Sequence, residues 1–171
     1  MRSHVILLVC TVLVSSRRAA AQSHDAREHG AHGQDSAFAA MQRRGRDAMG
    51  VDQYTSLHRF DALRDGGRIE LRRDRDDSVG TAVIRQHMRT IARAFASGDF
   101  ATPAMVHLQT VPGADVMRER RRAIRYEPID LPRGAALRIS SRDPVAVAAI
   151  HRFLAFQRRG HRASGTPSPS R

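Results

Sequence analysis

A pattern of strand, tight turn, strand and helix occurs twice in this chain, and it restricts the possible folds more than any other feature. The first copy begins at Arg59 and turns at Asp65-Gly66-Gly67, and the second begins at Arg125 and turns at Pro132-Arg133-Gly134. Equivalent residues lie 66 positions apart on both sides of the turn and 68 apart within the second strand, so small insertions are required. The repetition predicts two modules of one topology. Chance similarity between two arginine-rich segments is the alternative.

The local chemistry of each copy supports this pattern. Asp-Gly-Gly provides residues that tolerate positive φ, as a tight hairpin requires. Ile69 and Leu71 alternate with charged neighbours, which predicts a strand with one wet face. Apolar residues then recur at intervals of three and four between Ile84 and Phe95, which predicts an amphipathic helix. The helix of the second copy begins with Asp143 as N-cap and Pro144 at its first position.

Two ββα units predict an α+β fold in which a four-stranded antiparallel sheet carries helices on one face. We assign residues 37–160 to this single domain. Its halves are residues 54–97 and 123–160, joined by residues 98–122. We expect the two halves to frame a cleft that the joining segment covers.

The joining segment is divided by glycine and proline into short pieces. Within it we expect a short strand or turn at residues 105–108 and a helix at residues 114–122 that directs Met117 inward. Ahead of the first unit, we expect a short amphipathic helix that begins near Ser36 as N-cap and ends at Gly50.

The beginning of the chain is typical of a secretory signal. A ten-residue apolar run from Val5 to Val14 follows Arg2 and precedes Ala19-Ala20-Ala21. The run is too short to span a bilayer as a helix, but it matches the apolar region of a signal peptide. We therefore assign residues 1–21 to a signal peptide cleaved near Ala21, and we expect the mature protein in the periplasm or secreted.

Two further segments have too few apolar residues to join a core. Residues 22–36 are rich in His, Gly, Ala, Asp and Gln, and we expect a disordered leader that contains histidines. Residues 161–171 are polar and rich in serine and proline, and we expect a disordered tail.

The charge balance bears on possible partners. All 29 basic residues are arginine, against 17 acidic residues. Cleavage removes three arginines and leaves 26 − 17 = +9, and it also removes Cys10, so the mature chain has no thiol. For an exported chain this excess indicates an anionic envelope lipid or polymer rather than nucleic acid. A solvated arginine-rich face is the alternative.

One possible metal site lies at the expected new N-terminus, Gln22-Ser23-His24. A free amine, two backbone amides and the imidazole of a third-position histidine can bind Cu(II) or Ni(II) in square-planar geometry. Cleavage one residue away would displace His24, and cyclisation of Gln22 would block the amine. A polar leader without metal is the alternative.

A second possible copper site lies in the folded part and combines imidazole with thioether ligands. Its candidate residues are His58, His87, Met88, Met105, His107 and Met117. None of these pairs has the short spacing that marks an established metal motif. Methionines at helical spacing are usually core residues, and His87 on an apolar stripe is usually a buried histidine, so a metal-free core is the alternative.

No arrangement in the sequence amounts to an active-site motif. Asp74, Asp76 and Asp77 alternate with arginines and precede a helix, where acidic residues favour the N-terminal dipole. Asp65-Gly66-Gly67 lacks the Gly-Lys-Ser/Thr sequence of a phosphate loop, and no base partners Ser140-Ser141. The sequence therefore favours a protein that is not an enzyme.

Long stretches of the chain resemble a group of small exported bacterial proteins. The resemblance rests on Met41-Gln42-Arg43-Arg44-Gly45 with Ala48 to Ser56, on His58-Arg59-Phe60 with Asp65 to Leu71, and on His151 to Arg158. It implies export but no particular activity. Some similar sequences carry an aspartate carbamoyltransferase label. The chain lacks the Ser-Thr-Arg-Thr phosphate loop of that family, and we treat the label as a naming error.

These features favour a periplasmic, non-enzymatic binding or accessory protein whose cleft holds copper or another small ligand. The second hypothesis is a structural or interaction protein that contacts anionic envelope components through its arginines. The third is an unrecognised hydrolase.

Overall fold

The computed structural model describes residues 35–50 and 52–165, and residues 38–165 belong to one compact unit. The expected signal segment, its cleavage near Ala21 and most of the expected leader lie outside the described residues. Among the described residues, no helix is long and apolar enough to cross a membrane.

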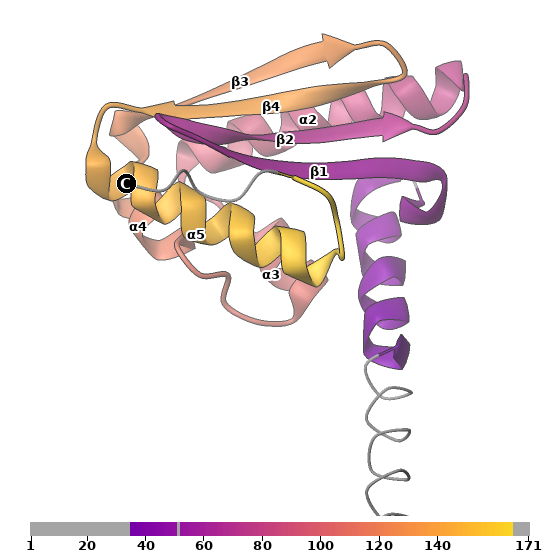
Figure 1. Ribbon diagram of the computed structural model, residues 1–171, viewed down its shortest axis with the longest axis horizontal. Helices are drawn as coiled ribbons and strands as arrows, with labels where there is room; N and C mark the ends of the chain where they lie inside the picture. Colours follow the sequence, from indigo (N-terminus) through magenta and orange to yellow (C-terminus); the bar gives the residue numbers. More distant parts are fainter. Residues whose placement is uncertain (1–34, 51, 166–171) are drawn as a thin grey trace, which may run out of the picture. The chain divides into compact units, whose positions relative to one another are not determined.

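The core of the unit is a four-stranded antiparallel sheet with helices on one face, so the expected α+β architecture of two ββα units is confirmed (Figure 1). The strand order is β1-β2-β4-β3, which places the two hairpins side by side. The elements of the two units are β1 (Ser56–Leu63), β2 (Gly66–Arg73) and α2 (Ser78–Ser97), then β3 (Ile124–Leu131), β4 (Gly134–Ser141) and α5 (Pro144–Gly160).

The two hairpins correspond at a constant spacing of 68 residues, since β1 and β3 begin at 56 and 124, and β2 and β4 at 66 and 134. The prediction of 66 for the first strands is therefore wrong by two residues. Side chains alternate between the two faces of a strand with a period of two, so a shift of two residues leaves each side chain on the sheet face that we expect. The insertion lies between the second strand and the helix, because the caps Asp77 and Asp143 are 66 apart. Duplication as the origin of the two units stays a prediction.

Both unit helices begin as the sequence predicts. Asp77 accepts a hydrogen bond from the backbone N of Gly80 at 2.9 Å, and Asp143 accepts one from Val145 N at 2.8 Å. These carboxylates satisfy backbone donors that have no partner within the helix. Pro144 occupies the first turn of α5, where its missing N–H is not needed.

The helix of each unit packs mainly on the hairpin of the other unit. α5 lies on β1 and β2, whereas α2 lies on β3 and β4. This crossed packing buries the core between the inner sheet face and both helices. The fully buried side chains of the core include Ile84, Met88, Leu137, Ile139, Ile150, Phe153 and Leu154.

Shorter elements complete the unit. The segment between the halves forms α3 (Ala101–His107), α4 (Ala114–Glu119) and the 3-10 turn η2 (Arg121–Ala123). The expected strand or turn at residues 105–108 is wrong, because most of it is the end of α3. The expected helix at 114–122 is correct at its start, and Met117 is buried.

A helix also covers residues 35–49, ahead of the 3-10 turn η1 (Gln53–Thr55). It ends at Gly50, whose φ of 75° is the left-handed conformation that glycine adopts readily. The expected stop is therefore confirmed, but Ser36 lies within the helix rather than capping it.

The expected start of the tail at residue 161 is wrong. His161 is buried, and the backbone O of Ser164 accepts a hydrogen bond from Phe60 N at 2.9 Å. Residues 163–165, which we call the strap, therefore lie along the free edge of β1. Residues 166–171 lie outside the described part of the chain.

Candidate functional site

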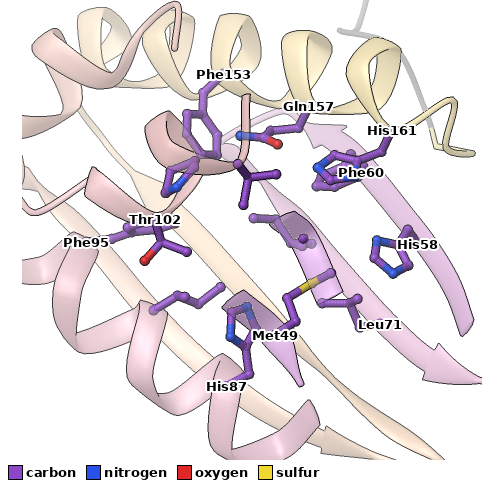
Figure 2. Close-up of a pocket in the computed structure, with 15 residues that line it drawn as sticks. Met49, His58, Phe60, Leu71, His87, Phe95, Thr102, Phe153, Gln157 and His161 are labelled. Carbon is purple, nitrogen blue, oxygen red and sulfur yellow. The ribbon is translucent and has the colours of Figure 1, made fainter. Parts of the chain in front are cut away.

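A cavity of about 70 Å³ lies between α2 and α5, above β1 and β2 (Figure 2). The joining segment contributes to its wall through Thr102, Pro103 and Val106 of α3, and the helix at residues 35–49 contributes Gly45 and Met49. A single water needs roughly 10–15 Å³, so the cavity has room for several waters or a small organic molecule. Most of the surrounding side chains are apolar.

The two unit helices present related positions to this cavity. Each helix uses three side chains at intervals of four residues, which lie on one helix face, and on α5 the third is the C-cap residue His161. The three pairs, each 66 residues apart, are His87 with Phe153, Ile91 with Gln157, and Phe95 with His161. The same face of both ββα helices therefore forms the cavity. Where α2 has an imidazole (His87), α5 has a phenyl ring (Phe153), and where α2 has a phenyl ring (Phe95), the end of α5 has an imidazole (His161).

Three histidines from three elements line the cavity, and burial keeps them uncharged. Burial lowers the pKa of His58 on β1 to about 4, with a smaller contribution from His87. Burial likewise lowers the pKa of His87 on α2 to about 4 and that of His161, after α5, to about 3. A charged imidazole is disfavoured because no aspartate or glutamate lines the cavity to offset its desolvation. At neutral pH each ring offers one N–H donor and one N acceptor.

Hydrogen bonds fix two of the surrounding polar groups. The Ser56 hydroxyl lies 3.2 Å from His58 Nε2. His107 Nε2 lies 2.8 Å from Gln157 Oε1, and since an amide oxygen only accepts, this histidine donates from Nε2. His107 thereby holds the Gln157 side chain at the cavity wall.

The ring of His107 also supports His161 from behind. The two ring centroids are 5.0 Å apart with planes at 84°. A Cβ atom at Gly160 would lie 2.5 Å from His107 Cε1, so glycine is required where α5 passes this ring. Burial lowers the pKa of His107, which stays neutral beside the cavity. His107 therefore contributes to the site by positioning Gln157 and His161.

The structure brings together only part of the copper set that the sequence suggested. His58 and His87 line the cavity, and His107 lies behind it. Met105 is 52% exposed on α3, and Met117 is fully buried in the core. His24 lies outside the described residues. Within residues 35–50 and 52–165, no three His, Cys, Asp or Glu side chains are placed to hold a metal ion.

Sequence reasoning missed two polar residues of the cavity wall, although it suggested that the segment from Met49 to Ser56 forms a ligand-facing edge together with His58, and Met49 and His58 do line the cavity. Gln157 is not singled out by the sequence. His161 was assigned to the tail. The signal that could have found it is its spacing, because His161 continues the four-residue interval of Phe153 and Gln157.

Comparisons with protein-family models, with curated proteins and with solved structures found no match to this chain.

Proposed function

We propose that this chain is a non-enzymatic binding protein, and that its ligand is a small, uncharged, largely apolar molecule held in the cavity between α2 and α5. The observation that supports this most strongly is the composition of the wall. Three neutral imidazoles from β1, α2 and the end of α5 surround an apolar space. An apolar pocket with a few convergent polar groups of shifted pKa is the usual form of a small-molecule site.

The composition of the cavity wall also supports an uncharged ligand. Despite the many arginines of the chain, no arginine, aspartate or glutamate lines the cavity. An anion would have no guanidinium partner and a cation no carboxylate partner, and an unpaired charge is costly to bury. A neutral hydroxyl or N–H group, by contrast, can be matched by the imidazoles or by Gln157.

The binding protein acts outside the cytoplasm in this proposal. The apolar run from Val5 to Val14 and the small residues before Gln22 support this location. N-terminal sequencing of the protein recovered from a periplasmic fraction should give a start near Gln22. Recovery of full-length protein from the cytoplasmic fraction alone would contradict the location without affecting the cavity.

Gly45 offers a way to test the cavity with a matched control. It lines the cavity, and a Cβ atom there would lie 3.5 Å from Met49 Cε and 4.0 Å from Val106 Cγ1, which are ordinary contacts. Gly45→Ala therefore fits, whereas the longer side chain of Gly45→Leu occupies the cavity itself. Both changes also favour the helix, so neither should unfold the protein.

Calorimetric titration with phenol tests the proposal, because phenol is a small ring with one hydroxyl. We expect phenol to bind the unmodified chain and Gly45→Ala, to bind Gly45→Leu at least about tenfold more weakly, and benzoate not to bind. Equal phenol affinity in all three proteins would place binding elsewhere and overturn the proposal. Copper(I) that binds the unmodified chain and displaces phenol would make the cavity a copper site instead.

A further inference from the structure

Five segments meet at one end of the sheet, away from the start of α2 (Figure 1). They are the β1–β2 hairpin, the C-terminus of α2, α4, η2 and the connection from β4 to α5. Ser141 joins three of them, because its backbone N donates to Asp65 O at 2.9 Å and its hydroxyl donates to Ala123 O at 2.7 Å. Arg118 Nε donates to Gly98 O at 3.0 Å, which attaches α4 to the end of α2.

Exposed arginines gather on this end, and we call them the end patch. They come from four of the five segments. The members are Arg64, Arg118, Arg120, Arg121, Arg122 and Arg142. Arg118 and Arg121 lie side by side, since a Cβ atom at Gly98 would be 3.0 Å from Arg118 Cγ and 3.2 Å from Arg121 Cδ. The fold, rather than the sequence run alone, therefore assembles the patch.

Carboxylates balance only a minority of these arginines. Arg118 pairs with Asp115 at 3.3 Å and Arg120 with Asp143 at 3.4 Å, while Asp65 is occupied by Arg138. Of the described residues, none provides a carboxylate partner for the remaining four, Arg64, Arg121, Arg122 and Arg142. Asp99, just after the end of α2, and Glu119 are further exposed acidic residues at this end, while Asp61 and Glu70 of the hairpin pair with Arg59, Arg68 and Arg72. The end patch thus carries an excess of positive charge.

We infer that the end patch docks this protein on the surface of an anionic phospholipid membrane. A cluster of four to eight basic residues is the size that binds anionic lipid surfaces, and guanidinium groups bind phosphate oxygens with two parallel hydrogen bonds. Val145, at the start of α5 beside Arg142, is 47% exposed and adds an apolar contact. Among the described residues of these five segments, no aromatic ring is exposed for nucleic-acid bases to stack on, which favours lipid over nucleic acid.

Two double variants of equal charge test this inference in the full-length chain. Arg122→Gln with Arg142→Gln removes two exposed patch arginines whose side chains make no hydrogen bond or ion pair among the described residues. Arg43→Gln with Arg75→Gln removes two exposed arginines elsewhere on the unit and serves as control. Any effect of residues 1–21 is the same in all three proteins.

Co-sedimentation with vesicles of equal parts phosphatidylglycerol and phosphatidylcholine gives the readout. We expect binding that weakens as salt increases, that falls about tenfold or more in the patch variant and that changes less than about twofold in the control. Equal losses in both variants would show an effect of net charge alone and overturn the inference. Failure to bind these vesicles would overturn it as well, and so would patch-dependent binding to duplex DNA in preference to vesicles.

Discussion

The two ββα units share one topology but differ in what covers them. Along β1 the inward residues Ser56, His58, Phe60 and Ala62 are all buried, whereas much of β3 is exposed. Gly45 and Met49, α3 and the strap all lie on the side of the first hairpin. The repeated topology therefore provides the scaffold, and these unrepeated segments produce the cavity.

Related strand positions show the same contrast. At the spacing of 68, His58 corresponds to Tyr126 and Phe60 to Pro128. His58 faces the cavity, whereas Tyr126 packs edge-on against Phe95 at 5.9 Å, and burial raises its pKa. The first unit uses this position for a hydrogen-bonding ring in the cavity wall, and the second uses it for packing.

Acidification should lower the free energy of unfolding most, because it protonates the buried histidines His58 and His161 beside the first hairpin. Burial lowers the pKa of His58 to about 4 and that of His161 to about 3, while the unfolded chain binds these protons near pH 6.5. The stabilising contribution is thus complete above pH 6.5 and is lost as the pH falls below it. The expected loss is on the order of 5 kcal/mol between pH 6.5 and 4.5.

Urea unfolding across this pH range measures the loss. In His161→Phe, which matches the related Phe95, the decline should be shallower by about 1.4 kcal/mol per pH unit. An unchanged slope in this variant would contradict the assignment of a neutral, buried His161.

Alanine substitutions at the related positions 87 and 153 should lower the free energy of unfolding by different amounts. Phe153 is 1% exposed and contacts the rings of Phe95 and Phe100, so Phe153→Ala should cost about 4 kcal/mol. His87 is half-buried at the cavity wall, and His87→Ala should cost about 1 kcal/mol. Denaturant unfolding measures both values. Equal losses of unfolding free energy would contradict the expected difference between the cavity-facing residues of α2 and α5.

The second strands differ in how closely a helix approaches them. A Cβ atom at Gly67 would lie 2.0 Å from Leu154 Cδ1 and 2.7 Å from Asp61 O, so Gly67→Ala should cost about 3 kcal/mol. The related residue is Ala135, and Ala135→Gly should cost only about 1 kcal/mol. Thermal unfolding compares the two variants. A tolerated Gly67→Ala would show that α5 lies farther from the first hairpin.

The two edge strands are protected by different means, and this should give the smallest effect. The strap accepts the hydrogen bond of Phe60 N–H on β1, whereas the related Pro128 on β3 has no N–H. Gly165 has a φ of 145°, and a Cβ atom there would lie 1.9 Å from Phe60 O. Gly165→Ala should therefore release the strap and cost about 1 kcal/mol.

Amide hydrogen exchange detects this release directly. The Phe60 amide should exchange about tenfold faster in Gly165→Ala, while the Leu137 amide in the sheet centre should not change. Equally fast exchange at both amides would indicate global destabilisation instead.

Local chemistry explains which parts of the fold were predictable. Asp77, Asp143 and Pro144 act through neighbouring backbone groups, so the helix starts follow from sequence alone. α3 was missed because Pro103 reads as a helix breaker. It stands in the first turn of α3, where no hydrogen bond of its N–H is required.

The cavity was less predictable because it depends on tertiary packing. The stripe of His87, Ile91 and Phe95 was visible as an apolar helix face, but its partner stripe on α5 follows only from the crossed packing of the helices. His161 lies between Gly160 and a polar segment, and this local sequence is typical of a disordered tail. Only the pairing of the strap with β1 shows that the chain stays on the fold here. The copper set failed to assemble because Met105 and Met117 lie on different faces of the joining segment.

In our proposal, the first hairpin, α2 and α5 enclose a binding site for an uncharged molecule. A crystal soaked in 4-bromophenol tests this most directly, since bromine is located by its anomalous scattering. We predict a bromine peak inside the cavity, within contact of Met49 and the cavity imidazoles, and no such peak in Gly45→Leu. An empty cavity in the unmodified protein, or the same peak in both proteins, would contradict the account.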